Sequence, residues 1–170
     1  MSAGRQKRVT LVLAVVTALV LAASVPGSLR GVWERGGLYI FSREFLVDLP
    51  KRLFGPGRFR FILQPLVAMT LGVAAGRADA RAGRPPYLYA LLLGSENRGR
   101  LARSALGDVA NLLLMGILVD SVCQWLILGA SYFGAALVVG PVLIALPYAT
   151  ARALANRATT ALERRRARRP

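Results

Sequence analysis

The chain has 170 residues, of which 55% are hydrophobic and 18% are charged, and 23 Lys and Arg against 8 Asp and Glu give a net charge of +15. It contains no His and a single Cys, which excludes His-dependent Ser or Cys catalytic groups, Cys/His zinc sites, His-ligated haem and an intrachain disulfide. We therefore expect a small membrane protein without a catalytic group, a metal site or another cofactor.

Four apolar stretches carry the hydrophobicity, and they cover residues 9–25, 61–75, 109–129 and 132–149. A bilayer core about 30 Å thick needs roughly 20 helical residues. The second stretch is short for this purpose and spans the core only if Arg58 and Arg60 extend to the interface. The pattern predicts an all-α, polytopic membrane bundle with four spans preferred.

The first stretch admits a second interpretation. The basic residues before it and the small residues Ala22, Ala23 and Ser24 near its end are also typical of a secretory signal peptide. Its apolar run is long for a signal peptide and continues to Val25, which favours a retained span that ends before Pro26. If this segment is cleaved or lies at the interface, three spans remain.

Part of the segment between the first two spans is amphipathic. The apolar residues Leu38, Phe41, Phe45 and Leu49 recur at a spacing of three or four, which places them on one face of a helix. The spacing predicts an interfacial helix over residues 38–49 that Pro50 terminates.

The basic residues are unequally divided between the two sides of the predicted membrane. Of the 23 Lys and Arg, 16 lie in the segments on one side and 7 in the single long segment on the other side. Because short loops rich in Lys and Arg stay in the cytoplasm, we expect both ends of the chain to be cytoplasmic. The predicted organisation is a basic cytoplasmic segment 1–8, span 9–25, extracytoplasmic loop 26–60, span 61–75, basic cytoplasmic loop 76–108, spans 109–129 and 132–149, and an Arg-rich cytoplasmic tail 150–170.

Arginines on the predicted cytoplasmic side are candidates for contact with an anion or a lipid headgroup. Gly83–Pro86 predicts a stiff turn, and a restrained guanidinium at Arg84 can bind a phosphate or carboxylate in a bidentate manner. The same turn also fits a plain positively charged stop after a span, and Ser95 is expected to cap a following basic helix. For the tail, anionic lipid is the nearest partner, and its lack of aromatic residues argues against nucleic acid. The candidates are Arg77, Arg81, Arg84, Arg164, Arg165 and Arg166.

Polar residues inside the predicted spans require an explanation, because an ionisable side chain there costs about 2.5–3.5 kcal/mol. Asp120 lies near the middle of the third span, and Gln124 follows one turn later, close enough to hydrogen-bond to it. No Lys, Arg or His lies in that span, so we expect Asp120 to be neutral at pH 7. Asn111 lies on the opposite face, and Gln64 precedes Pro65 at a local helix break in the second span.

Two functional interpretations follow from these polar residues. A neutral Asp120 that holds helices together fits a non-catalytic accessory or scaffold component, whose partners would be anionic lipid and another protein or a second copy of the chain. A carboxylate that exchanges a proton or binds a cation fits a small transporter or channel that uses Asp120 and Gln124. An intramembrane lipid enzyme would need paired acids, for which Asp79 and Asp108 are the candidates.

Small residues recur at four-residue spacing in the predicted spans. Such spacing allows two helices to approach closely, either within one chain or between two copies. The pairs are Gly72 and Gly76, Ala130 and Gly134, and Ala136 and Gly140.

The runs FGPGRFRFILQPLVA, ADARAGRPPYLYALL and GDVANLLLMGILVDSVCQWLILG resemble a group of small bacterial integral membrane proteins to which no function is assigned. The resemblance covers residues 53–156 and leaves out the first span and the 38–49 helix. It implies a multi-pass protein of the bacterial cytoplasmic membrane and implies no activity. Its most specific elements are Asp79, Arg81, the Gly83–Pro86 turn, Asp108, and Asp120 with Gln124.

Overall fold

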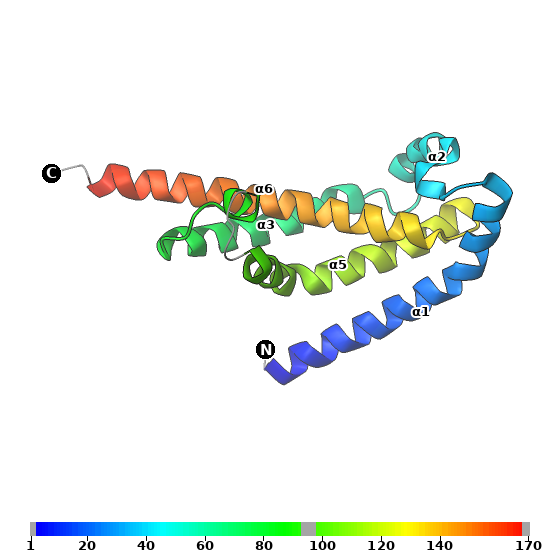
Figure 1. Cartoon of the computed structure of the whole chain (residues 1–170), viewed down its shortest axis with the longest axis horizontal. Helices are drawn as coiled ribbons and strands as arrows, with labels where there is room; N and C mark the ends of the chain where they lie inside the picture. The colour runs from blue at the N-terminus through cyan, green and yellow to red at the C-terminus, as the bar shows by residue number, and fades with distance from the viewer. Residues whose placement is uncertain (1–2, 93–97, 168–170) are drawn as a thin grey trace. The chain divides into compact units, whose positions relative to one another are not determined.

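The computed structural model of the protein describes residues 3–92 and 98–167, and every regular element in these ranges is a helix, which confirms the predicted all-α class. Ser95, the expected helix cap, lies outside the described residues. In chain order the helices are α1 (Ala3–Arg35), the short 3-10 helix η1 (Tyr39–Phe41), α2 (Arg43–Phe54), α3 (Arg60–Arg81), α4 (Tyr87–Leu92), α5 (Arg98–Leu128) and α6 (Phe133–Ala167) (Figure 1).

Four helices, α1, α3, α5 and α6, are long and apolar enough to cross a membrane. Their most apolar 18-residue windows have mean hydropathies between 1.4 and 2.4, yet only 11% to 28% of each window is buried inside the protein. Exposure of so many apolar side chains is unfavourable in water and favourable in the hydrocarbon core of a bilayer. The chain is therefore a multi-pass membrane protein.

Helix α1 passes through Pro26 and ends at Arg35, whereas the sequence predicts an end before Pro26. A proline removes one backbone hydrogen bond and bends a helix, but the helix continues where packing supports the next turn. Ser28 supplies that support, since its hydroxyl donates to Ser131 O at 3.2 Å and accepts from Phe133 N at 3.1 Å. Figure 1 shows α1 changing direction in its second half.

The amphipathic segment forms two elements, where the sequence predicts one helix over 38–49. Ser42 adopts an extended backbone conformation after η1, and its hydroxyl caps α2 by accepting from Phe45 N at 3.3 Å. Helix α2 then continues through Pro50 to Phe54, and Gly55 N closes it on Lys51 O at 2.8 Å. The expected end at Pro50 is wrong because a single missing hydrogen bond does not outweigh the turns on either side of it.

The chain divides into two compact units, and helices α3, α5 and α6 contribute residues to both. Unit 1 comprises residues 1–62 and 111–143. Unit 2 comprises residues 63–110 and 144–170. Each unit contains its own cluster of buried charged side chains.

In unit 1, small polar residues of α1 face the protein, and the opposite side of the central part of this helix is apolar. Thr17 and Ser28 are 2% and 4% exposed, and Thr17 Oγ1 donates to Leu114 O at 3.4 Å. On the other side of the helix, Leu11 and Leu19 are each 65% exposed. Such a division suits a helix that contacts its neighbours through small polar groups and lipid through its aliphatic side chains.

Close helix contact in unit 1 also depends on a glycine of α6. A Cβ atom added to Gly140 would lie 2.7 Å from Gly116 C and 2.8 Å from Ile117 N, so only glycine fits there. Ala136, one turn earlier, is fully buried, whereas a Cβ on Gly134 would meet open space. The spacing of Ala136 and Gly140 therefore packs α6 on α5 within the chain.

The GxxxG pair of α3 packs against α6 in unit 2. A Cβ on Gly72 would collide with the carbonyl oxygen of Tyr148, and one on Gly76 would collide with that of Arg152. The two glycines thus let the backbones of α3 and α6 approach closely, which is the intrachain role that their spacing allows.

Candidate functional site

Asp120 of α5 lies in a buried charge cluster of unit 1, together with Arg52 of α2 and Arg60 at the start of α3. Arg60 Nη2 lies 2.8 Å and Arg52 Nη1 lies 3.6 Å from Asp120 Oδ1, and each of the three side chains is at most 3% exposed. The expectation that no cation compensates Asp120 is therefore wrong. The two arginines come from segments about sixty residues earlier in the chain, which the composition of the span itself could not reveal.

Gln124 completes the polar environment of Asp120. Its Nε2 donates to Asp120 Oδ2 at 2.6 Å, as the four-residue spacing predicts, and its Oε1 accepts from Tyr132 N at 2.9 Å. Gln124 therefore ties the carboxylate to the turn that connects α5 with α6. Both oxygens of Asp120 have a polar neighbour, Arg60 on one side and Gln124 on the other.

The cluster contains two positive charges and one negative charge, and aromatic rings contact the guanidinium group of Arg52. The guanidinium carbon of Arg52 lies 5.6 Å from the ring centroid of Tyr39 and 5.4 Å from that of Phe45. None of the three Arg52 nitrogens has a hydrogen-bond partner among the described residues. Contact with ring faces stabilises such a cation by about 2 kcal/mol or more when it is withdrawn from water.

A smaller contact in the loop region connects η1 with α2. Tyr39 Oη donates to Asp48 Oδ2 at 2.8 Å, and Lys51 Nζ donates to Asp48 Oδ1 at 2.8 Å. Burial acts to raise the pKa of Asp48, but the hydrogen bonds from Lys51 and Tyr39 outweigh it, so this pKa lies below its usual value. Burial, together with the hydrogen bond to Asp48, raises the pKa of Tyr39 to about 12, which keeps Tyr39 a neutral donor.

The other two predicted intramembrane polar residues do not join Asp120. Asn111 Oδ1 accepts a hydrogen bond from Thr10 Oγ1 at 2.7 Å, so Asn111 connects α5 with α1. Gln64 belongs to unit 2, and its Oε1 is buried without a hydrogen-bond partner among the described residues. Of the four predicted residues, only Asp120 and Gln124 form one site.

Unit 2 contains a second charge cluster, centred on Arg152 of α6. Arg152 Nε donates to Asp79 Oδ2 at 2.6 Å and Nη2 donates to Asp79 Oδ1 at 3.2 Å, a bidentate pair in which both residues are 4% exposed. Arg84 Nη1 adds a further contact to Asp79 Oδ1 at 3.2 Å. The pair connects the end of α3 with α6 through charge-assisted hydrogen bonds, the strongest kind in proteins.

The same arginine brings in the second acid that the sequence singled out. Tyr148 Oη donates to Asp108 Oδ2 at 2.6 Å and accepts from Arg152 Nη1 at 2.9 Å. Asp79 and Asp108 thus both lie next to Arg152, which the spacing of these residues in the sequence did not predict. Because both acids contact Arg152 or Tyr148, the arrangement holds α3, α5 and α6 together.

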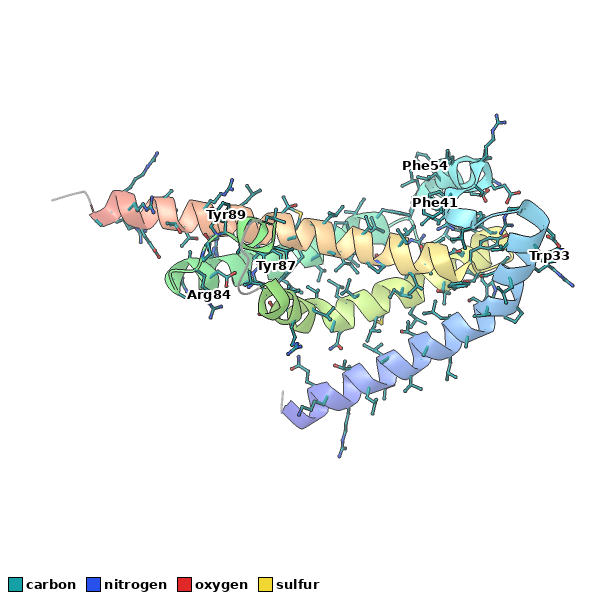
Figure 2. The ribbon with its side chains drawn as sticks, viewed as in Figure 1. Trp33, Phe41, Phe54, Arg84, Tyr87 and Tyr89 are labelled. Carbon is teal, nitrogen blue, oxygen red and sulfur yellow. The ribbon has the colours of Figure 1, made fainter. Side chains whose placement is uncertain are left out.

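Tyr87 of α4 covers this cluster from the loop side. The guanidinium carbon of Arg152 lies 4.7 Å from the Tyr87 ring centroid, and the ring is 6% exposed. Burial raises the pKa of Tyr87, while the charge of Arg152 acts in the opposite direction. Figure 2 labels Tyr87 and Arg84 on either side of the proline turn.

A cavity of about 710 Å³ lies between that turn and one face of α6, within unit 2. Of the arginines predicted to contact an anion, Arg84, Arg164 and Arg165 line it. The other three, Arg77, Arg81 and Arg166, are exposed and do not line it. Arg157 also lines the cavity, although its place in the sequence indicated only that it belongs to the Arg-rich tail.

No protein family, curated protein or solved structure matches the chain. Among the described residues, no group of three His, Cys, Asp or Glu side chains could hold a metal ion. The features of the described residues that bear on function are the two charge clusters and the cavity.

Proposed function

We propose that the protein is a non-catalytic, multi-pass component of a bacterial cytoplasmic membrane, an accessory or scaffold subunit that contacts anionic lipid and a protein partner. The observation that carries the proposal is the pairing of the buried acids. Asp120 is engaged with Arg60 and Gln124, and Asp79 is engaged with Arg152. Groups committed to such contacts stabilise a defined arrangement of helices, which is what a scaffold requires.

The surroundings of Asp120 favour this function over a small transporter or channel. Proton or ion transfer needs a carboxylate that reaches water or a cavity. Asp120 is 1% exposed, and neither of the two cavities described, of about 710 and 20 Å³, is lined by Asp120 or Gln124. Two neighbouring guanidinium groups also oppose binding of a cation at this carboxylate.

The contacts of the basic residues in 26–60 are compatible with an extracytoplasmic location of this loop. Seven Lys and Arg in a translocated loop are more than the positive-inside rule favours. Arg52 and Arg60, however, are buried against Asp120, and Arg35 lies 4.8 Å from the Tyr132 ring centroid. These three have a structural role inside unit 1, so their presence does not argue for a cytoplasmic loop.

The contacts of α1 support its retention as a span. A cleaved signal peptide needs no specific contacts with the mature protein, yet Thr10 and Thr17, which precede the possible cleavage site, hydrogen-bond to residues beyond position 110. These bonds connect α1 with α5. The proposed orientation then leaves residues 76–108 and 150–170 on the cytoplasmic side, facing anionic lipid.

Purified protein reconstituted in liposomes tests the choice between scaffold and transporter. We expect proton flux under a clamped membrane potential to equal that of empty liposomes, for the wild type and for Asp120→Asn alike. The scaffold role further predicts that crosslinking in native membranes captures a discrete assembly larger than the 18.3 kDa monomer. Wild-type flux that Asp120→Asn abolishes would favour the transporter, and an exclusively monomeric protein would contradict the scaffold.

A further inference from the structure

We propose that the cavity between the Gly83–Pro86 turn and α6 binds a phosphate-bearing anion. Its α6 wall is one helical face, because the lining positions recur in pairs every four residues from Asn156 to Arg165. Three of these positions are Arg157, Arg164 and Arg165, and the turn adds Arg84. No carboxylate lines the cavity among the described residues.

The turn that forms the opposite wall is held in place. Gly83 has a φ of 66°, which disfavours any side chain there, and two prolines follow Arg84. Asn156 Nδ2 donates to Arg84 O at 3.1 Å and fastens the turn to α6. The cavity is therefore bounded by two elements whose relative position within unit 2 is set by the protein rather than by a ligand.

The charge available for a ligand is strongly positive. Asp79 forms ion pairs with Arg84 and Arg152, and Asp108 forms one with Arg152. The two negative charges therefore formally balance the two positive charges. The three α6 arginines of the cavity remain, and they are exposed to solvent at its rim. Guanidinium groups match the geometry of phosphate oxygens, and the Thr160 hydroxyl on the same face is an additional donor.

This inference deepens the lipid contact proposed above, because it replaces a diffuse basic surface with a defined site. Two sources supply the required chemistry, the headgroup of a phospholipid and a soluble phosphate or phosphate ester. Both present two or more anionic or polar oxygens on one phosphorus. The site itself can be tested on solubilised protein, so it does not depend on the outcome of the flux experiment.

Titration calorimetry on the purified full-length protein in a neutral detergent tests the site. The probes are inorganic phosphate, glycerol 3-phosphate, short-chain phosphatidic acid and, as a zwitterionic control, short-chain phosphatidylcholine. The test variant is Arg157→Gln with Arg164→Gln. The matched control is Arg58→Gln with Arg103→Gln, which removes the same charge from exposed positions that do not line the cavity.

We expect at least one anionic probe to bind, about tenfold more weakly in the test variant and within about twofold of the wild type in the control. Binding of inorganic phosphate or glycerol 3-phosphate identifies a soluble ligand, and binding of phosphatidic acid alone identifies a lipid headgroup. Equal weakening in both double variants would reduce the effect to general surface charge and overturn the site. Failure of every anionic probe to bind would overturn it as well.

Discussion

Arg152 and Asp79 are joined by two hydrogen bonds, of 2.6 and 3.2 Å, although 73 residues separate them in the sequence. The pair lies about one turn beyond Gly76, one of the two glycines that let α3 and α6 approach closely. A bidentate contact at such a crossing fixes both the distance and the rotation of the two helices. The polar residues of this protein thus define how its helices pack. Apolar side chains alone would not do so, because they contact lipid as favourably as they contact another helix.

Loss of this pair should destabilise the protein strongly. Replacing Asp79 with Ala leaves Arg152 buried with a weakened set of partners, and breaking a buried ion pair in this way costs about 3–5 kcal/mol. Thermal unfolding in detergent, followed by circular dichroism, measures the effect. Arg81→Ala, at an exposed position two residues away, serves as control and should leave the melting temperature nearly unchanged. Equal melting temperatures for the two variants would show that the pair contributes nothing.

The cluster around Asp120 should behave as a coupled unit. In a double-mutant cycle of Asp120→Asn and Arg60→Gln, the double variant should lose less stability than the sum of the single variants, by about 1–3 kcal/mol. The reason is that each single change leaves the other charge buried with fewer partners. Arg58, which is exposed, provides the matched cycle, and Asp120→Asn with Arg58→Gln should be additive within about 0.5 kcal/mol. Additivity in both cycles would mean that Arg60 and Asp120 do not interact.

Glycine at position 76 is required by the contact between α3 and α6. Gly76→Leu would drive a side chain into the backbone of α6 and should cost at least about 3 kcal/mol. Gly107→Ala in α5 is the control, because a Cβ there meets open space and alanine favours the helix by up to about 1 kcal/mol. Chemical denaturation of the two variants should therefore shift in opposite directions. A tolerated Gly76→Leu would show that the helices do not approach this closely.

The contacts of Asp48 make a contribution to stability that depends on pH. Since the pKa of Asp48 is lowered in the folded protein, this stabilisation is complete above the unfolded value of about 3.9 and disappears as the pH falls through the folded value. The difference in melting temperature between wild type and Asp48→Asn should be constant from pH 7 to about pH 5 and shrink below about pH 4. A difference that does not vary down to pH 2.5 would contradict this role.

The sequence predicted the helical class and the candidate spans because a long apolar run in a membrane satisfies its backbone hydrogen bonds within one segment only as a helix. It also predicted the bond between Gln124 and Asp120, since residues four apart on a helix are neighbours. It missed Arg52 and Arg60 as partners of Asp120, and Arg152 as the partner of Asp79. These contacts depend on how helices distant in the sequence pack together, and no local spacing reports that packing.

The ends of the helices were the least predictable feature for a related reason. Pro26 and Pro50 each disfavour a helix locally, yet α1 and α2 continue through them. Ser28 and Arg52, which each follow a proline by two residues, make tertiary contacts that support the turns beyond it. The sequence predicted Arg84, Arg164 and Arg165 as contacts for an anion, but it predicted no cavity and did not single out Arg157. These residues meet through the packing of α6 and not through proximity in sequence.

The proposed orientation requires that residues 26–60 and the Arg-lined face of α6 lie on opposite sides of a membrane, and a measurement of membrane topology decides this. Single cysteines at the exposed positions Gly37, Arg81 and Ala158, in a Cys123→Ala background, would be labelled with a membrane-impermeant maleimide in intact bacterial cells. We expect Gly37→Cys to be labelled from outside and Arg81→Cys and Ala158→Cys to react only after permeabilisation. Labelling of all three from the same side, or the reverse pattern, would contradict it.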